Sequence, residues 1–270
     1  MTTTNATAVP TEVDEALDPA ASPVKAIVGS TLTFIAMVAL WEVLVRRLNI
    51  PGWLLPAPSA IGEAMLDWRS ELLGHFMVTL YETLVGFAVA IAISIPLAVA
   101  VVYSPILQNT IYPILLAFQS MPKVAIAPLL ALWIGFGTLP KIVVVFLVCF
   151  FPIIVATASG LAAVPAPLMD LIRSLSASSL QTFVKIRFPT AMPHIFVGLK
   201  IAITFAVIGA VIGEFVGSES GLGYLILVST SQSRTPLAFG ALVLLTIMSI
   251  VLYYGIALIE RVVVPWAPRN

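Results

Sequence analysis

Charged residues are scarce in this sequence. Asp, Glu, Lys and Arg make up 10% of the 270 residues, whereas they make up about 25% of a typical soluble domain. Hydrophobic residues make up 60%, and the mean hydropathy is +1.09. This composition excludes an ordinary soluble domain and predicts an integral membrane protein. Because the formal net charge is zero, the sequence also lacks the basic excess that is typical of nucleic-acid binding.

The motifs of common catalytic and metal sites are also lacking. The one cysteine, Cys149, lies in an uncharged apolar run and cannot form an internal disulfide, so we expect it to serve packing. The two histidines, His75 and His194, are far apart and belong to no H-E-x-x-H pattern. The phosphate-binding motif G-x-x-x-x-G-K-S/T and the nucleophile motif G-x-S-x-G are both missing. We therefore expect no catalytic, cofactor-binding or metal-binding residue in this chain.

The first 24 residues are expected to form a disordered acidic tail. They contain four acidic residues and no basic residue, and their many Thr, Ala and Pro residues bury too little apolar surface to stay ordered. An acidic start does not fit a cleavable signal peptide, so the first apolar run is expected to be retained. Residues 25–270 are predicted to form the transmembrane domain.

The long apolar runs predict about six transmembrane helices, since a helix needs about 20 apolar residues to cross a bilayer. Five runs of about that length lie at residues 27–45, 79–102, 141–161, 195–217 and 236–264. Between the first two, prolines and then a short amphipathic helix at 61–68 are expected. The run at 106–136 is too long for one span, and prolines divide it. There we expect a brief interfacial helix, a break near 120–123 and a third span that reaches 135–137.

Two charged residues in the apolar segments are candidates for the translocation pathway. A lysine near bilayer depth costs about 2.5–3.5 kcal/mol on insertion scales. Lys123 follows Met121 and Pro122 at the predicted break, so it is expected either to line the pathway or to reach the interface by snorkelling. Glu214 lies near the end of the fifth span, where it either faces the pore or reaches the outer interface, and we favour the interface. The candidate pathway residues are therefore Met121, Pro122, Lys123 and Glu214.

A basic amphipathic stretch interrupts the apolar second half of the chain at residues 168–200. Its apolar residues keep helical spacing on both sides of a break at 176–178, which predicts two short helices. The second helix can begin with a capping box formed by Ser178 and Gln181. It is expected to stop near Phe188, because the residue before a proline avoids helical angles.

This stretch resembles the EAA loop of ABC importer permeases, with the pattern R-x-L-(G)-A-x(11)-P-x(3)-P. In that family the loop docks into a cleft on a separate ATPase subunit and transmits its motion. The resemblance assigns to this coupling loop, at about 165–195, the residues Asp170, Arg173, Leu175, Ser176, Ala177, Gln181, Lys185, Pro189 and Pro193. Ser176 stands where the family usually has glycine, and a left-handed backbone would cost serine about 1–2 kcal/mol there. The alternative is an ordinary interfacial helix pair with basic residues near lipid headgroups.

Other segments carry the same resemblance, from about Leu54 to Val264. LLPAPSAI is similar to the family's usual external loop, and SMPKVAIAPLLALWIGFG resembles the signature of a span that lines the route. TLYETLVGF resembles T-L-x-R-x-L-x-G-F, with Glu82 where a basic residue is common. GSESGLGYLI matches G-x-x-S-G-L-G-Y-L-I almost residue for residue, and its glycines permit a tight re-entry of the backbone.

The resemblance implies an all-α integral membrane protein with the MetI-like fold of ABC importer permeases. Such a chain is a non-catalytic subunit that forms the translocation pathway. The resemblance is closest to the branch that imports nitrate, taurine, alkanesulfonates and, in some members, pyrimidine vitamin precursors. The implied partners are two copies of a cytoplasmic ATPase that binds ATP and Mg, a second permease copy in a homodimer, and a periplasmic or lipid-anchored substrate-binding protein.

The implied location is the bacterial cytoplasmic (inner) membrane. Six spans place both termini on the side of the basic loop, which the positive-inside rule makes cytoplasmic, although Arg46 and Arg47 would then lie outside. An ion-coupled secondary transporter is the alternative function. That class is expected to have internal repeats and several intramembrane ionisable residues. This sequence has no clear repeat, and its candidate residues are only Lys123, Glu82 and Glu214.

Overall fold

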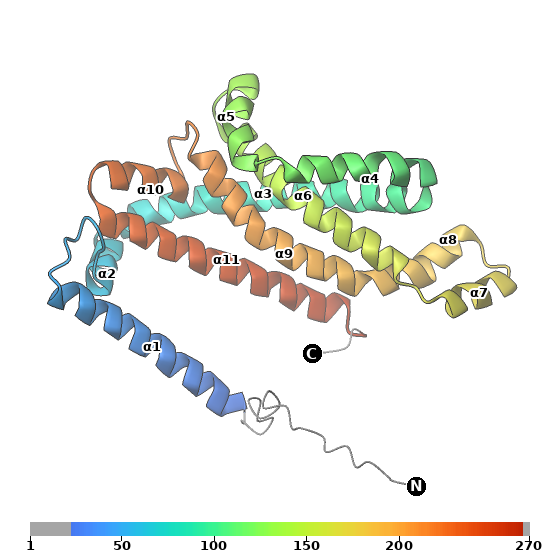
Figure 1. Cartoon of the computed structure of the whole chain (residues 1–270), viewed down its shortest axis with the longest axis horizontal. Helices are drawn as coiled ribbons and strands as arrows, with labels where there is room; N and C mark the ends of the chain where they lie inside the picture. The colour runs from blue at the N-terminus through green and yellow to red at the C-terminus, as the bar shows by residue number, and fades with distance from the viewer. Residues whose placement is uncertain (1–22, 267–270) are drawn as a thin grey trace, which may run out of the picture.

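The structure is a computed structural model, and it describes residues 23–266. Within that range every regular element is a helix (Figure 1). The elements are α1 (Pro23–Arg47), α2 (Pro58–Asp67), α3 (Arg69–Tyr103), α4 (Pro105–Ser120), α5 (Lys123–Ile134), α6 (Thr138–Ala162), α7 (Ala166–Ser174), α8 (Ser179–Thr182), the π-helical turn η1 (Phe183–Arg187), α9 (Phe188–Glu214), α10 (Leu222–Ser231) and α11 (Thr235–Val263). Almost all of the predicted acidic tail lies outside the described residues.

Five helical segments of the described chain are long and apolar enough to cross a membrane. They are Val28–Arg47, Arg69–Tyr103, Thr138–Ala162, Ser179–Glu214 and Thr235–Val263. Each contains one of the predicted spans or most of it, and the short amphipathic helix predicted after the prolines is present as α2. The chain is therefore a multi-pass membrane protein built of helices, as its composition predicts.

The predicted third span differs from the structure. The break at Met121 and Pro122 is present, but the helix that follows, α5, has only 12 residues. At 1.5 Å per residue it is about 18 Å long, well short of the roughly 30 Å hydrocarbon core. Gly135 then ends α5 with a φ of 96°. Figure 1 shows α4 running back along α3 and α5 turning away from it, so these two short helices together return the chain to the start of α6.

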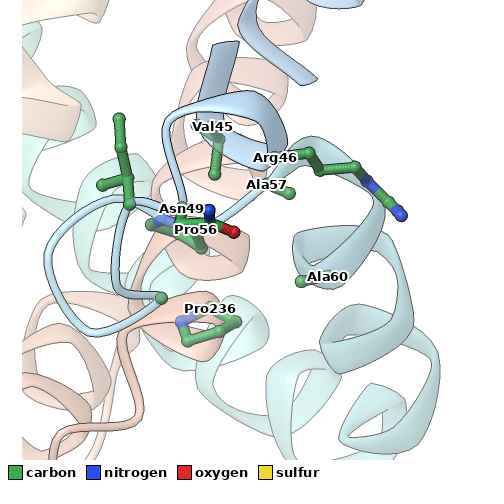
Figure 2. Close-up of a pocket in the computed structure, with 9 residues that line it drawn as sticks. Val45, Arg46, Asn49, Pro56, Ala57, Ala60 and Pro236 are labelled. Atoms are coloured by element: carbon green, nitrogen blue, oxygen red, sulfur yellow. The ribbon is translucent and has the colours of Figure 1, made fainter. Parts of the chain in front are cut away.

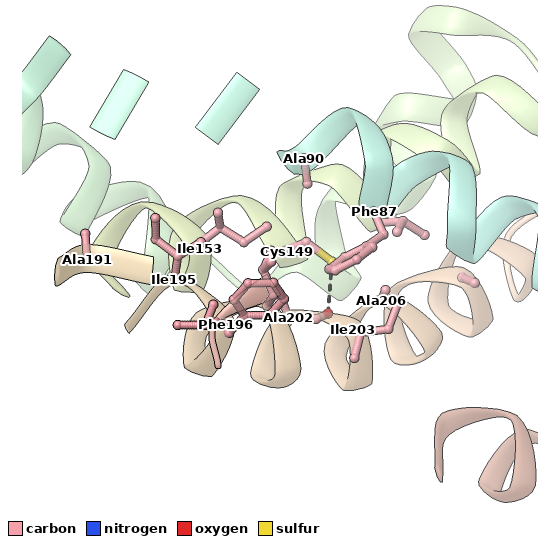
Figure 3. Close-up of a cluster of buried hydrophobic side chains, with 14 of the residues drawn as sticks. Phe87, Ala90, Cys149, Ile153, Ala191, Ile195, Phe196, Ala202, Ile203 and Ala206 are labelled. Carbon is pink, nitrogen blue, oxygen red and sulfur yellow. Dashed lines mark hydrogen bonds between the residues drawn. The ribbon is translucent and has the colours of Figure 1, made fainter. Parts of the chain in front are cut away.

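The core is formed mainly by α3, α6 and α9, which pack along much of their lengths. Figure 3 shows part of this core, where the buried Cys149 donates from its Sγ to the carbonyl oxygen of Ala202 at 3.2 Å. Small residues allow the close approach. A Cβ added to Gly198 would lie 2.4 Å from the Cβ of Ala156, and one added to Gly160 would lie 2.7 Å from the Cβ of His194. The packing role predicted for the cysteine is consistent with this position.

Helix α1 lies apart from the three-helix core and approaches α2 at its C-terminal end (Figure 1). Glu42 joins the two helices, since its carboxylate accepts hydrogen bonds from the amide and the hydroxyl of Ser59 at 3.0 and 2.8 Å. Arg46 forms an ion pair with the same carboxylate. Apart from these contacts, α1 exposes most of its apolar side chains, including Leu32, Phe34 and Met37.

Candidate functional site

The unit formed by α7, residues 175–178, α8 and η1, here called the coupling unit, projects from one end of the bundle (Figure 1). Helix α7 ends in a Schellman motif. The amide of Ser176 donates to the carbonyl of Arg173 at 3.0 Å, and the amide of Ala177 donates to the carbonyl of Ile172 at 3.3 Å. Ser176 has a φ of +51°, so this serine adopts the left-handed conformation that glycine favours at such a position.

The next helix begins with the capping box that the sequence predicts. The hydroxyl of Ser178 accepts from the amide of Gln181 at 3.2 Å, and the Gln181 side chain accepts from the amide of Ser178 at 2.9 Å. Two amides that the helix leaves without intrahelical partners are satisfied in this way. The Schellman motif and the capping box together fix both sides of the turn at residues 175–178.

The predicted stop near Phe188 is wrong, because the helix continues through Pro189 into α9. A π-helical turn makes this possible. The amide of Phe188 donates to the carbonyl of Phe183, five residues earlier. A proline removes one i→i−4 hydrogen bond and its ring crowds the carbonyl of residue i−4. The wider turn of a π-helix accommodates both effects, so Pro189 lies in the first turn of α9 without ending the helix.

The coupling unit exposes apolar and charged side chains together. Leu175 and Leu180 are each 71% exposed, and Leu171 and Val184 are also exposed. Arg173 pairs with Asp170 at 3.2 Å on the same surface. Side chains of this size are costly to leave in water, so this surface has the character of a partner-binding site. The structure thus places the residues that the resemblance assigns to the loop on one projecting unit and its junction with α9.

That junction is attached to the rest of the bundle by two aromatic residues. The guanidinium of Arg187 lies 5.2 Å from the ring centroid of Tyr103 at the end of α3. The indole of Trp266 donates to the carbonyl of Pro189 at 3.4 Å. Lys185, Pro189, Pro193 and Trp266 also line a pocket of about 380 Å³, together with Leu168, Ile186 and Thr190.

The three predicted pathway residues at the break lie where α4 ends and α5 begins. Met121 is exposed, and Lys123 is half-buried at the first position of α5. The ammonium of Lys123 donates to the carbonyl of Gln119 at 2.7 Å, near the C-terminus of α4. A cation is stabilised there by the helix dipole. No carboxylate pairs with Lys123 among the described residues, and its role in a pathway stays a prediction.

Glu214 does not reach the outer interface that the sequence analysis favoured. Its side chain is only 1% exposed, because the last turn of α9 turns the carboxylate towards the loop at 217–221 and α10. The carboxylate accepts from the hydroxyl of Thr79 at 2.6 Å and from the amide of Gly223 at 2.5 Å. A pathway role for Glu214 stays a prediction, since this burial is that of the single chain.

The loop in the GSESGLGYLI segment packs on these polar groups. The amide of Leu222 donates to the hydroxyl of Thr79 at 2.8 Å, and the amide of Gly221 donates to Nδ1 of His75 at 2.9 Å. A Cβ on Gly221 would lie 2.2 Å from the Glu214 carboxyl group, and its φ is +112°. The backbone therefore turns tightly against these side chains, and its re-entry at membrane depth stays a prediction.

A buried ion pair joins α3 to α6 beside this loop. The ammonium of Lys141 lies 2.6 Å from Oε1 of Glu82, and the two residues are 6% and 0% exposed. Sequence reasoning missed Lys141 as a site residue. The signal that could have identified it is the presence of one lysine and one glutamate in separate apolar spans, because charges at membrane depth tend to pair.

Another pocket lies elsewhere in the described chain. It has a volume of about 500 Å³ and lies between the end of α1, the following loop, α2 and the start of α11. Figure 2 shows Arg46 at its edge, with the guanidinium directed away from Pro236. That guanidinium donates to the hydroxyl of Ser59 at 3.0 Å. The pocket is a surface hollow away from the Glu82–Lys141 pair.

Long apolar helices, a tight glycine loop held by polar side chains and a projecting coupling unit are the features of a multi-pass membrane transport component. The family comparison agrees with this class. Residues 82–267 match the family described as binding-protein-dependent transport system inner membrane component. The chain belongs to this family of ABC transporter permeases, which removes the ion-coupled secondary transporter as an alternative.

Two curated relatives illustrate the match. The chain is 32% identical to the formylaminopyrimidine transport permease protein ThiX of Halalkalibacterium halodurans over 241 residues, covering 89% of this chain and 96% of ThiX. It is 28% identical to the putative aliphatic sulfonates transport permease protein SsuC of Bacillus subtilis, covering 85% of this chain and 84% of SsuC. These relatives are transport permeases, so the chain is a transport component.

The fold is shared with a solved transporter. The inward-facing MetNI methionine ABC transporter has a chain that superposes with a TM-score of 0.64 at 23% identity. The superposition covers 73% of this chain and 97% of that chain. The expected MetI-like fold is thereby confirmed.

Proposed function

We propose that this permease forms half of the translocation pathway of an importer that a separate ATPase drives. The observation that carries the proposal is the projecting coupling unit, whose leucines are exposed while its turn is fixed by hydrogen bonds at both ends. A rigid element with an unburied apolar surface suits the transmission of motion from a partner. ATP and Mg are bound by that ATPase, and this chain itself binds no cofactor.

The assembly that we propose has two permease copies, two ATPase copies and one substrate-binding protein. Two copies of one chain pair most simply about a two-fold axis. The coupling unit and both termini are cytoplasmic, because the ATPase works where ATP is available. The membrane is the bacterial cytoplasmic (inner) membrane.

The proposed substrate is a small anionic solute of the nitrate, sulfonate or taurine type, or a pyrimidine vitamin precursor. The names of ThiX and SsuC support this range. The charges of the chain add a physical argument for an anion. Glu82 and Glu214 are both buried among partners, whereas Lys123 is half-buried and has, among the described residues, only a backbone acceptor. A cation without a carboxylate partner attracts an anion that passes close to it.

Uptake by Lys123 variants tests this proposal. The complex is reconstituted in vesicles with its ATPase and binding protein, and uptake is measured for a panel of sulfonates, nitrate and pyrimidines. Lys123→Met is expected to lower uptake of an anionic substrate by about tenfold, which corresponds to about 1.4 kcal/mol. That loss lies within the attraction of about 1–4 kcal/mol between unit charges 4 Å apart at dielectric constants of 80 to 20.

Lys123→Arg is the matched control, since it keeps the positive charge and is expected to transport nearly normally. Assembly with the ATPase is measured in parallel for both variants. Near-normal uptake by the Lys123→Met complex would show that Lys123 only snorkels to the interface. ATP hydrolysis by the purified permease without its ATPase would contradict the proposed division of labour.

A further inference from the structure

Three charged residues, Glu82, Lys141 and Glu214, are here called the buried triad. Lys141 lies in the first turn of α6 and Glu214 is the last residue of α9, and these helix ends lie away from the coupling unit (Figure 1). The three residues come from three different helices: α3, α6 and α9. None of the three is more than 6% exposed. Two acids with one base leave one formal negative charge without a partner.

The hydrogen bonds of the triad account for most of its oxygen atoms. Oε1 of Glu82 accepts from Lys141 at 2.6 Å, and the two oxygens of Glu214 accept from Thr79 at 2.6 Å and from the amide of Gly223 at 2.5 Å. Oε2 of Glu82 is buried and has no donor in the described chain. Glu82 lies one helical turn after Thr79, whose hydroxyl donates to Glu214, and a Cβ added to Gly213 would lie 3.0 Å from the Cα of Lys141. The three residues of the triad are therefore neighbours.

Two neighbouring buried carboxylates repel each other unless one of them carries a proton. A proton shared between them would also give the unpartnered Oε2 of Glu82 a hydrogen bond. The neighbouring groups supply no second cation. His75 accepts the Gly221 amide at Nδ1, so its ring is neutral, because both nitrogens of a charged imidazole are donors.

The other ionisable groups near the triad do not compensate its charge. Glu71 lies one helical turn before His75 on α3 and is itself acidic, Tyr224 packs against the His75 ring, and Glu219 is an exposed acid in the loop. The N-terminus of α10 offers only about half a positive charge through its dipole. A full negative charge buried at this point is costly.

We propose that the buried triad is a proton-binding site, in which Glu82 and Glu214 share one proton while Lys141 balances the remaining negative charge. The proton comes from water during folding or assembly, and the resulting triad is neutral. Through Gly223 and Thr79 this neutral unit fixes the loop at 217–221 and the start of α10 against α3. Glu214 is a positioning residue for that loop.

Infrared spectroscopy of the complex with its ATPase in lipid nanodiscs tests the proposal, because a protonated carboxyl group has a C=O band of its own that shifts in D2O. The wild-type complex is expected to show this band at neutral pH. Glu82→Gln and Glu214→Gln are each expected to abolish it, since a single remaining carboxylate pairs with Lys141. Lys141→Met is expected to double it, because both carboxyl groups must then be neutral.

Glu219→Gln is the matched control, since it removes an acid from the same loop outside the triad and is expected to leave the band unchanged. The wild-type and glutamine spectra are sufficient if Lys141→Met does not assemble. Absence of the band from the wild type, or its persistence in both glutamine variants, overturns the proposal. The first outcome would mean that Glu214 is ionised and is held by the N-terminus of α10.

Thermal unfolding of the same complexes gives an independent measurement. Glutamine has the shape of a protonated glutamate and keeps both a donor for Glu82 and an oxygen that accepts from Gly223, although its amide nitrogen cannot accept from Thr79. Glu214→Gln is therefore expected to lower the melting temperature only slightly. Glu214→Ala removes the acceptor of Gly223 and is expected to lower it by several degrees. Equal losses in the two variants would contradict a neutral side chain at this position. These measurements need no transport assay, so they are independent of the proposed substrate.

Discussion

At the scale of one residue, Ser176 stands where the family usually has glycine, and it adopts the left-handed backbone conformation that glycine favours. The serine keeps a φ of +51° and both hydrogen bonds of the Schellman motif. The positive φ followed from the resemblance, because glycine is usual at this position. The hydrogen bonds of the turn became visible only in the structure.

Ser176→Gly is expected to stabilise the purified chain by up to about 1.5 kcal/mol. Relief of the left-handed strain contributes about 1–2 kcal/mol, and the greater freedom of glycine in the unfolded chain offsets about 0.5–1 kcal/mol. Thermal unfolding and uptake measure the effect, and uptake is expected to be kept or improved. Ala177→Gly is the control, since Ala177 has no positive φ and glycine is expected to destabilise there. Complete loss of uptake with normal insertion would reveal a role for the Ser176 side chain.

At the same scale, the interaction partners of the charged residues are the feature that the sequence predicts least well. Glu82 was noted only as a departure from a motif, and Lys141 served only to mark the start of a span. Their ion pair joins residues that are 59 apart in the chain, a contact that no local pattern encodes. The sequence analysis favoured the outer interface for Glu214 for a similar reason. Its hydrogen-bond partners belong to two other helices, α3 and α10, and no local pattern indicates them.

At the scale of one element, α8 has only four residues and depends on its first turn. An isolated helix of this length does not form in water. The capping box and the continuation into η1 and α9 therefore hold it in place. The capping box was legible in the sequence because it depends on two residues three positions apart. The π-helical turn could not be predicted in the same way, because the local preference of a residue before a proline is to end the helix.

Ser178→Ala is expected to destabilise the start of α8 by about 1 kcal/mol, the usual cost of losing an N-cap side chain. The coupling unit would then fray, and substrate-stimulated ATP hydrolysis by the complex is expected to fall severalfold while the ATPase subunit alone is unaffected. Ser179→Ala changes the neighbouring serine and keeps the capping box, so it serves as the control. Equal effects of the two substitutions would show that the cap is not what holds α8.

At the scale of the whole molecule, α11 is tied to the core by an ion pair on the side of the coupling unit. Lys200 of α9 and Glu260 of α11 lie 2.8 Å apart, and each side chain is 20% exposed. A double-mutant cycle with Lys200→Met and Glu260→Gln is expected to give a coupling energy of about 1 kcal/mol, measured by unfolding the purified chain in detergent.

The pair Asp170–Arg173 provides the comparison for that cycle. Its side chains are 71% and 75% exposed, and solvent screens such pairs strongly. Its coupling energy is therefore expected to be much smaller. Equal coupling in the two cycles would mean that burial of the α9–α11 pair adds nothing to its strength.

The sequence by itself determined the membrane class, the positions of five long spans, the break at Met121 and Pro122 and the capping box of α8. Each of these depends on hydropathy or on residues a few positions apart. The tertiary structure decided the short length of α5, the passage of a helix through Pro189 and the partners of Glu82, Lys141 and Glu214. These features depend on contacts between helices that are distant in the sequence, and the free energy of such contacts outweighs local preference once the helices pack.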